Sequence, residues 1–225
     1  MSLIMALANH NGIVVSADRL SVRKYYDENE KHLMDVPVHG ITGYQKAFVL
    51  NDDHVIAFAG AGEIYGKVST EDFICQLARR ELDTLNLPIY KEAEYIRKRV
   101  VEAHDSDSLI ALMVIGIEDG KNYILTTDTS DPEIHNNTDG VNGFKEIGIT
   151  GLVGYLADKK KIDKYNLSIG EMSKFLHNLN VDAVDYMREH GHSQVISEDC
   201  DIIIITEQYN TRYDEHDLRR LEALR

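Results

Sequence analysis

The sequence has little cysteine, little proline and few basic residues, and each shortage excludes a class of protein. Two cysteines, Cys75 and Cys200, cannot supply a disulfide framework for a chain of 225 residues, so we expect both thiols to be reduced and buried. With only three prolines and no low-complexity tract, the chain can bury a substantial core. We therefore expect a single domain over residues 1–225, with two smaller domains as the alternative.

Acidic residues outnumber basic ones. The chain has 24 Lys and Arg against 38 Asp and Glu, which gives a formal net charge of −14. A nucleic-acid partner requires clustered basic side chains that displace counterions from the phosphates. The basic runs at 159–161 and 219–220 are too short to provide such a cluster. The sequence therefore predicts no nucleic-acid partner.

The apolar run at residues 3–8 is short. It has no basic leader before it, and it ends at Asn9-His10-Asn11. A run of this length fits neither a secretory signal nor a membrane span. We expect a cytoplasmic protein with no membrane partner.

Apolar segments in pairs predict antiparallel strands. The pairs are 3–9 with 12–18, 46–50 with 55–59, 109–117 with 123–127, and 202–206 with 210–213. Turn-forming residues such as Asn11-Gly12 and Asn51-Asp52-Asp53 separate the members of a pair. A further strand is expected at 146–150, and the polar segment 23–42 is typical of a long flap or loop insertion.

Helical periodicity appears between these strands. Apolar positions recur at helical spacing over 73–82 and again over 89–104. Ser168 and Glu171 have the spacing of a capping box, which predicts one or two helices up to Met187, and leucines at 218, 221 and 224 predict a C-terminal helix. The order of elements suits two antiparallel sheets between helix layers, which is an α+β fold with a four-layer αββα sandwich.

Three short segments of the sequence are VVSADR at 14–19, KAF at 46–48 and FAG at 58–60. They resemble the corresponding segments of proteasome β-type subunits and the related bacterial heat-shock protease ring, which are N-terminal nucleophile hydrolases. The spacing also agrees with this family, because Asp18 follows Ser2 by sixteen positions and Gly60 follows Lys46 by fourteen. The resemblance covers nearly the full length, with extra residues in the segment 23–42, and it implies the proteasome-like form of the sandwich.

The resemblance implies a nucleophile and a base at the start of the chain. Removal of Met1 would leave Ser2 with a hydroxyl nucleophile and a free α-amine that acts as its base. Lys46, held by Asp18, would be the cation that disfavours protonation of this amine. Ser2 lacks the methyl group of the more usual threonine, so its hydroxyl would be positioned more loosely.

Other family positions carry supporting roles by the same resemblance. The backbone N–H of Gly60, expected at the start of the first helix, would stabilise the tetrahedral oxyanion, and Thr150 would hold the α-amine by a hydrogen bond. The positions that shape the specificity pocket are Ser21, Tyr44, Phe58 and Gly62. A crowded pocket beside Tyr44 and Phe58 favours a small or slender side chain before the scissile bond.

One segment departs from the family. Just before the last sheet strand the family carries an Asp and, three residues on, a Ser followed by Gly, whereas residues 188–201 here are longer and lack this motif. The candidates to replace it are Glu189, Ser193, Ser197 and Asp199, and the sequence does not choose among them. His190 and His192 near Glu198 raise the question of a metal, but their spacing matches no zinc or calcium pattern. We expect no metal and no cofactor.

The resemblance implies a threonine- or serine-type endopeptidase that cleaves peptide bonds through an acyl-serine on Ser2. It also implies a homo-oligomeric chamber, peptide or unfolded-protein substrates, and an ATP-dependent unfoldase as a candidate partner. Two alternatives remain open, namely a non-catalytic scaffold subunit that retains Met1 and an amidohydrolase of the same superfamily acting on a small amide. In an inactive subunit Asp18 and Lys46 would form only a structural ion pair, with Gly60 as a plain helix-entry glycine and Thr150 as an ordinary strand-end hydroxyl.

Overall fold

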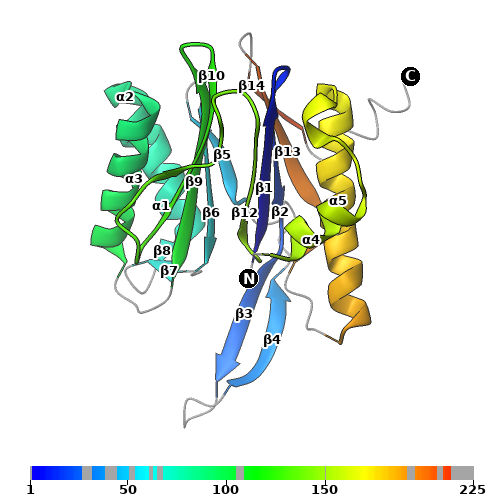
Figure 1. Cartoon of the computed structure of the whole chain (residues 1–225). Coiled ribbons are helices and arrows are strands. Elements are labelled where there is room, and N and C mark those ends of the chain that lie inside the picture. The colour runs from blue at the N-terminus through cyan, green and yellow to red at the C-terminus, as the bar shows by residue number, and fades with distance from the viewer. Residues whose placement is uncertain are drawn as a thin grey trace.

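Two antiparallel sheets of five strands each form the centre of the molecule (Figure 1). The computed structural model describes residues 2–26, 32–38, 45–50, 54–60, 63–64, 68–104, 109–149, 151–191, 196–206 and 210–213. The first sheet has the strand order β12-β1-β2-β13-β14, and these strands are Gly143–Gly148, Leu3–Asn9, Gly12–Asp18, Cys200–Ile205 and Asn210–Tyr213. The second has the order β11-β10-β9-β6-β5, with His135–Asn136, Lys121–Asp128, Ile110–Glu118, His54–Gly60 and Ala47–Leu50.

Helices cover the outer face of each sheet (Figure 1). The second sheet is covered by α1 (Thr70–Leu77), a π-helical turn (Ala78–Leu82), α2 (Asp83–Leu85) and α3 (Ile89–Ala103). The first sheet is covered by α4 (Leu152–Lys159), a 3₁₀ turn (Lys164–Asn166) and α5 (Ile169–Glu189). The chain therefore folds as an α+β structure with a helix, sheet, sheet, helix order of layers.

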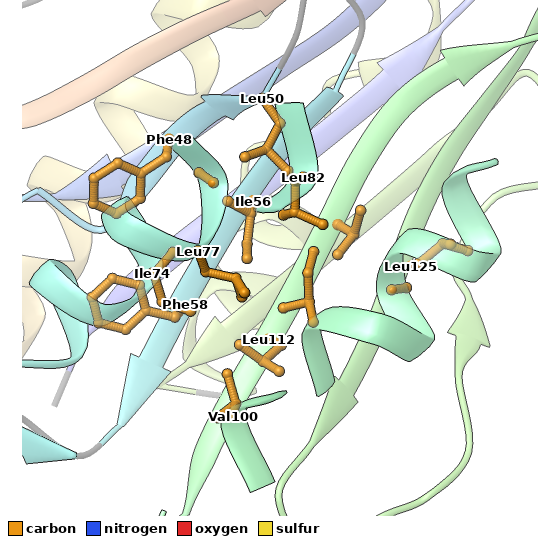
Figure 2. Close-up of a cluster of buried hydrophobic side chains, with 14 of the residues drawn as sticks. Phe48, Leu50, Ile56, Phe58, Ile74, Leu77, Leu82, Val100, Leu112 and Leu125 are labelled. Atoms are coloured by element: carbon orange, nitrogen blue, oxygen red, sulfur yellow. The ribbon is translucent and has the colours of Figure 1, made fainter. Parts of the chain in front are cut away.

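Apolar side chains fill all three spaces between these layers. One cluster joins α1 and α3 to the second sheet through residues such as Phe48, Ile74 and Leu112 (Figure 2). A second lies between the sheets, and a third lies under α4 and α5. Every residue of β1 and β2 is buried, because both faces of these strands are covered. This explains why their sequences are continuous apolar runs and not alternating ones.

The polar segment after Arg19 forms a hairpin of its own. Strands β3 (Ser21–Tyr26) and β4 (His32–Val38) make a separate two-stranded sheet that projects from the end of the sandwich (Figure 1). A second small sheet pairs β7 (Glu63–Ile64) with β8 (Val68–Ser69). The expected flap at 23–42 is a projecting hairpin where the structure describes it.

Most expected strands and helices are present, and several elements differ. The Ser168 capping box is confirmed. The Ser168 hydroxyl accepts from the Glu171 backbone N–H, the Glu171 carboxylate accepts from the Ser168 backbone N–H, and a single helix follows. Helix α4 and the short strands β7, β8 and β11 were not expected, and the strand expected at 146–150 lies at 143–148. The expected C-terminal helix lies outside the described residues. Among the helices described, none has the length and apolar character needed to cross a membrane.

Candidate functional site

A buried ion pair lies at the end of the sandwich from which the hairpin projects. The Lys46 Nζ donates to both carboxylate oxygens of Asp18 at 2.8 Å and to the carbonyl oxygen of Leu20 at 2.6 Å. The lysine side chain is 2 % exposed and the aspartate side chain is fully buried. All three donors of the ammonium group are therefore used inside the protein.

The two charges come from different sheets. Asp18 is the last residue of β2, and Lys46 directly precedes β5. The carbonyl of Lys46 accepts a hydrogen bond from the backbone N–H of Phe58 at 3.0 Å, which extends the β5–β6 pairing by one residue. Burial lowers the pKa of the Lys46 ammonium, while the charge and hydrogen bonds of Asp18 oppose this shift.

Ser2 lies beside this pair at the start of β1. Its carbonyl oxygen accepts from the backbone N–H of Ile149 at 3.0 Å, and the next backbone N–H, that of Leu3, donates to Asp18 Oδ1 at 2.7 Å. A Cβ built on Gly148 would overlap the Ser2 carbonyl oxygen, and the Gly148 φ is +97°. Glycine therefore allows the two strands to approach at this point. Ser2 is buried, with 6 % of its surface exposed.

Gly60 does not begin a helix. It is the last residue of β6, and the first helix begins ten residues later at Thr70, so the expected helix-entry position is wrong. Its φ is +135°, and a Cβ on it would overlap the Leu109 carbonyl oxygen. The glycine is thus required by the close approach of β6 to the start of β9. Its N–H therefore does not belong to a helix N-terminus. Gly60 is exposed, and it lies in β6 two residues beyond Phe58, whose N–H donates to the Lys46 carbonyl.

The structure describes two of the four residues expected to shape the specificity pocket, Ser21 and Phe58. Phe58 belongs to the core under α1, where it is 3 % exposed and stacks on Phe48 with ring centroids 6.5 Å apart. Its side chain therefore fills the core and does not line an open pocket, because Phe58 faces the helix layer. The backbone of Ser21 begins β3. Met1, Tyr44, Gly62 and Thr150 lie outside the described residues.

Two of the four candidates for the missing family motif contact the strand that carries Asp18. The Ser197 hydroxyl accepts from the backbone N–H of Arg19 at 3.1 Å and donates to the Asp199 carbonyl at 2.7 Å. The Asp199 carbonyl also accepts from the Arg19 N–H, at 3.2 Å. Glu189 ends α5 as an exposed residue, and Ser193 lies outside the described residues.

Two polar residues near this site were not expected from the sequence. Asn180 of α5 is fully buried and donates to the carbonyls of Ser197 and Glu198 at 2.7 and 3.0 Å. Glu146 of β12 accepts from the backbone N–H of Gly151 at the start of α4, and burial raises the pKa of its carboxyl. An asparagine within the apolar stripe of α5 was the available signal for Asn180. No comparable signal marked Glu146, since α4 itself was not expected.

His190 packs against an aromatic ring. It stacks on Tyr186 with ring centroids 4.0 Å apart, and its Nδ1 lies 2.8 Å from the Tyr186 carbonyl. Within the described ranges, no three His, Cys, Asp or Glu side chains are grouped closely enough to ligate a metal.

The polar groups at the site are the Ser2 hydroxyl, the Lys46 ammonium and the Asp18 carboxylate. Such groups suit proton transfer and charge stabilisation.

Known proteins give no independent assignment. No protein-family model matches the sequence, and no curated protein matches it. The chemistry of the site therefore has to be argued from its residues and contacts.

Proposed function

We propose that this protein is an N-terminal serine peptidase with a proteasome-like fold, which acts after Met1 has been removed. The observation that carries the proposal is the chain of contacts from Lys46 to Asp18 to the backbone N–H that directly follows Ser2. These hydrogen bonds connect a buried cation to the backbone beside the residue that would become the N-terminus. The layer order and the two antiparallel sheets support the proposed fold.

The proposed reaction uses Ser2 as both nucleophile and base. The pKa of a free α-amine is ordinarily about 7.7–8.0, and a nearby ammonium group disfavours its protonated form further. The neutral amine takes the proton of the Ser2 hydroxyl as the oxygen bonds to the peptide carbonyl carbon. The protonated amine then donates to the departing amine of the substrate, and water cleaves the acyl-serine.

Lys46 and Gly60 have separate parts in this proposal. The Lys46 ammonium, fixed by Asp18, stabilises negative charge on the attacking oxygen. The Gly60 N–H is the proposed donor to the oxyanion, a contribution that is typically worth about 3 kcal/mol. Peptides or unfolded proteins would be the substrates, reached inside a homo-oligomeric chamber and delivered by an ATP-dependent unfoldase.

Intact mass and covalent labelling test the proposal together. The purified protein is incubated with a peptide vinyl sulfone, and the modified residue is located by mass spectrometry. We expect a chain that starts at Ser2, a mass increase of one probe, and no increase for Ser2→Ala. Ser16→Ala is the matched control, because Ser16 is also a buried serine at the centre of the first sheet. A chain that keeps Met1 and does not react would refute the proposal.

One observation favours a non-catalytic scaffold as the second candidate. Ser2 is buried, with only 6 % of its surface exposed, which limits the access of a substrate to this residue. A retained Met1 would also move the free amine one residue away, about 3.8 Å along the Cα trace. Under this alternative the protein assembles into oligomers, keeps Met1 and remains inert to the probe.

A further inference from the structure

The loop that precedes β13 forms hydrogen bonds both with the residue that follows β2 and with helix α5. Towards the sheet, the Ser197 hydroxyl and the Asp199 carbonyl share the Arg19 N–H, which is the first backbone donor after Asp18. Regular pairing between β2 and β13 ends at the Asp18–Cys200 pair, so this N–H depends on the loop for its acceptors. Towards the helix layer, Asn180 donates to the carbonyls of Ser197 and Glu198.

Asn180 is poorly explained as a residue that only stabilises the core. It is fully buried in α5 among Leu176, Leu179, Ala183 and Val184. Its Oδ1 has no hydrogen-bond partner within the described part of the protein. An unpaired buried oxygen carries a desolvation penalty that an apolar side chain at this position would not have. The benefit of the asparagine lies in the two loop carbonyls that it fixes.

We propose that Asn180 is a positioning residue that holds the Asp18–Lys46 pair in place through the loop at 197–199. Asn180 fixes the loop, the loop fixes the backbone of Arg19, and Arg19 directly follows the carboxylate that holds Lys46. Arg188 contributes from the same helix, since its guanidinium donates to Glu198 at 2.9 Å. The catalytic consequence of this inference rests on the proposed peptidase function, while its structural consequence does not.

Three substitutions test the connection. Asn180→Ala removes both donors, and Ser197→Ala removes the hydroxyl acceptor of the Arg19 N–H. Asn180→Asp keeps the shape but cannot donate while ionised, and protonation at low pH restores one donor. Ser173→Ala is the matched control, because Ser173 is buried in the same helix and its hydroxyl donates within that helix, to the Ile169 carbonyl at 2.9 Å.

NMR resonances of the backbone amides and of the Lys46 side chain give a readout that is independent of activity. In Asn180→Ala and Ser197→Ala we expect shifted amide resonances for Leu3 and Arg19, faster exchange of the Arg19 amide by about tenfold, and a changed titration midpoint for the Lys46 ammonium. In Asn180→Asp the Arg19 resonance should return towards the wild-type position as the pH is lowered. Ser173→Ala should change none of these. Unchanged Arg19 and Lys46 resonances in the Asn180 variants would overturn the inference.

The labelling rate separates this inference from the proposed function. If Ser2 of the wild type reacts with the vinyl sulfone, Asn180→Ala should slow the reaction about tenfold, as expected for a catalytic group displaced by less than 1 Å. A labelling rate equal to that of Ser173→Ala would also overturn the inference. If the wild type does not react, only the peptidase proposal fails, and the resonances still decide the role of Asn180.

Discussion

Lys46 and Asp18 are each buried with almost no solvent contact, so each charge depends on the other. Removing one partner of such a pair leaves an uncompensated buried charge, which typically lowers the free energy of unfolding by about 3–5 kcal/mol. We expect a loss of this size for Lys46→Met. The double variant Asp18→Asn/Lys46→Met should lose far less than the sum of its single variants, since the neutral amide can still accept from the Leu3 N–H. Urea denaturation of the four proteins measures this coupling, and additive losses would show that the pair is not coupled.

Glu146 and Glu171 should respond to pH with opposite signs. Burial raises the pKa of the Glu146 carboxyl in the folded state, so the folded protein binds its proton more tightly than the unfolded chain does. The ionised Glu146 therefore destabilises the fold above its folded pKa, and this penalty is relieved as the pH falls towards the unfolded value of 4.5. For Glu171 the Ser168 hydroxyl and N–H lower the pKa, and the resulting stability is lost on acidification.

Comparison of two glutamine variants measures these slopes. The stability of Glu146→Gln relative to the wild type should be highest at neutral pH and should decrease as the pH falls towards 4.5. The stability of Glu171→Gln relative to the wild type should be lowest at neutral pH and should approach that of the wild type below pH 4.5. Thermal unfolding at a series of pH values gives both differences. Slopes of the same sign for the two variants would contradict the assigned environments.

At the scale of elements, the contact between β1 and β12 depends on one glycine. A methyl group at Gly148 would overlap the Ser2 carbonyl, and the φ of +97° is unfavourable for alanine. Gly148→Ala should therefore lower the free energy of unfolding by more than about 1 kcal/mol and displace Ser2. Gly154→Ala is the control, because it lies in α4 with open space around it and should stabilise the helix by about 0.5–1 kcal/mol. Urea denaturation gives both values, and equal effects would exclude the steric explanation.

The helices were predictable to the extent that local signals mark them. The α5 helix has a capping box and an apolar stripe, so its first residue and its buried face follow from the sequence. The α4 helix has no capping box, since Gly151 precedes it with a φ of +85° and the Glu146 carboxylate of the preceding strand accepts from the Gly151 N–H. A helix that is capped by a residue of the preceding strand has no capping signature at its own N-cap.

At the scale of the whole molecule, the β3–β4 hairpin is separate from the two large sheets. Ser21 and Val38 form the first pair of this hairpin, so residues 22–37 can be replaced by Asn-Gly without opening either five-stranded sheet. We expect the shortened protein to unfold cooperatively, with a urea midpoint close to that of the wild type. Circular dichroism during urea titration measures this. Loss of the cooperative transition would mean that the hairpin is part of the stable core.

The sequence by itself determined the strand pairs, the main helices and the layer order, because hydrophobic period and turn residues act locally. It also identified Asp18 and Lys46, although only as positions in a resemblance. Tertiary structure decided what those positions contact: Asp18 and Lys46 meet because the end of β2 in one sheet lies beside the start of β5 in the other. It also decided that Gly60 ends a strand, that Phe58 points into the core and that Asn180 reaches the loop at 197–199. These contacts join residues distant in sequence, so no local pattern could encode them.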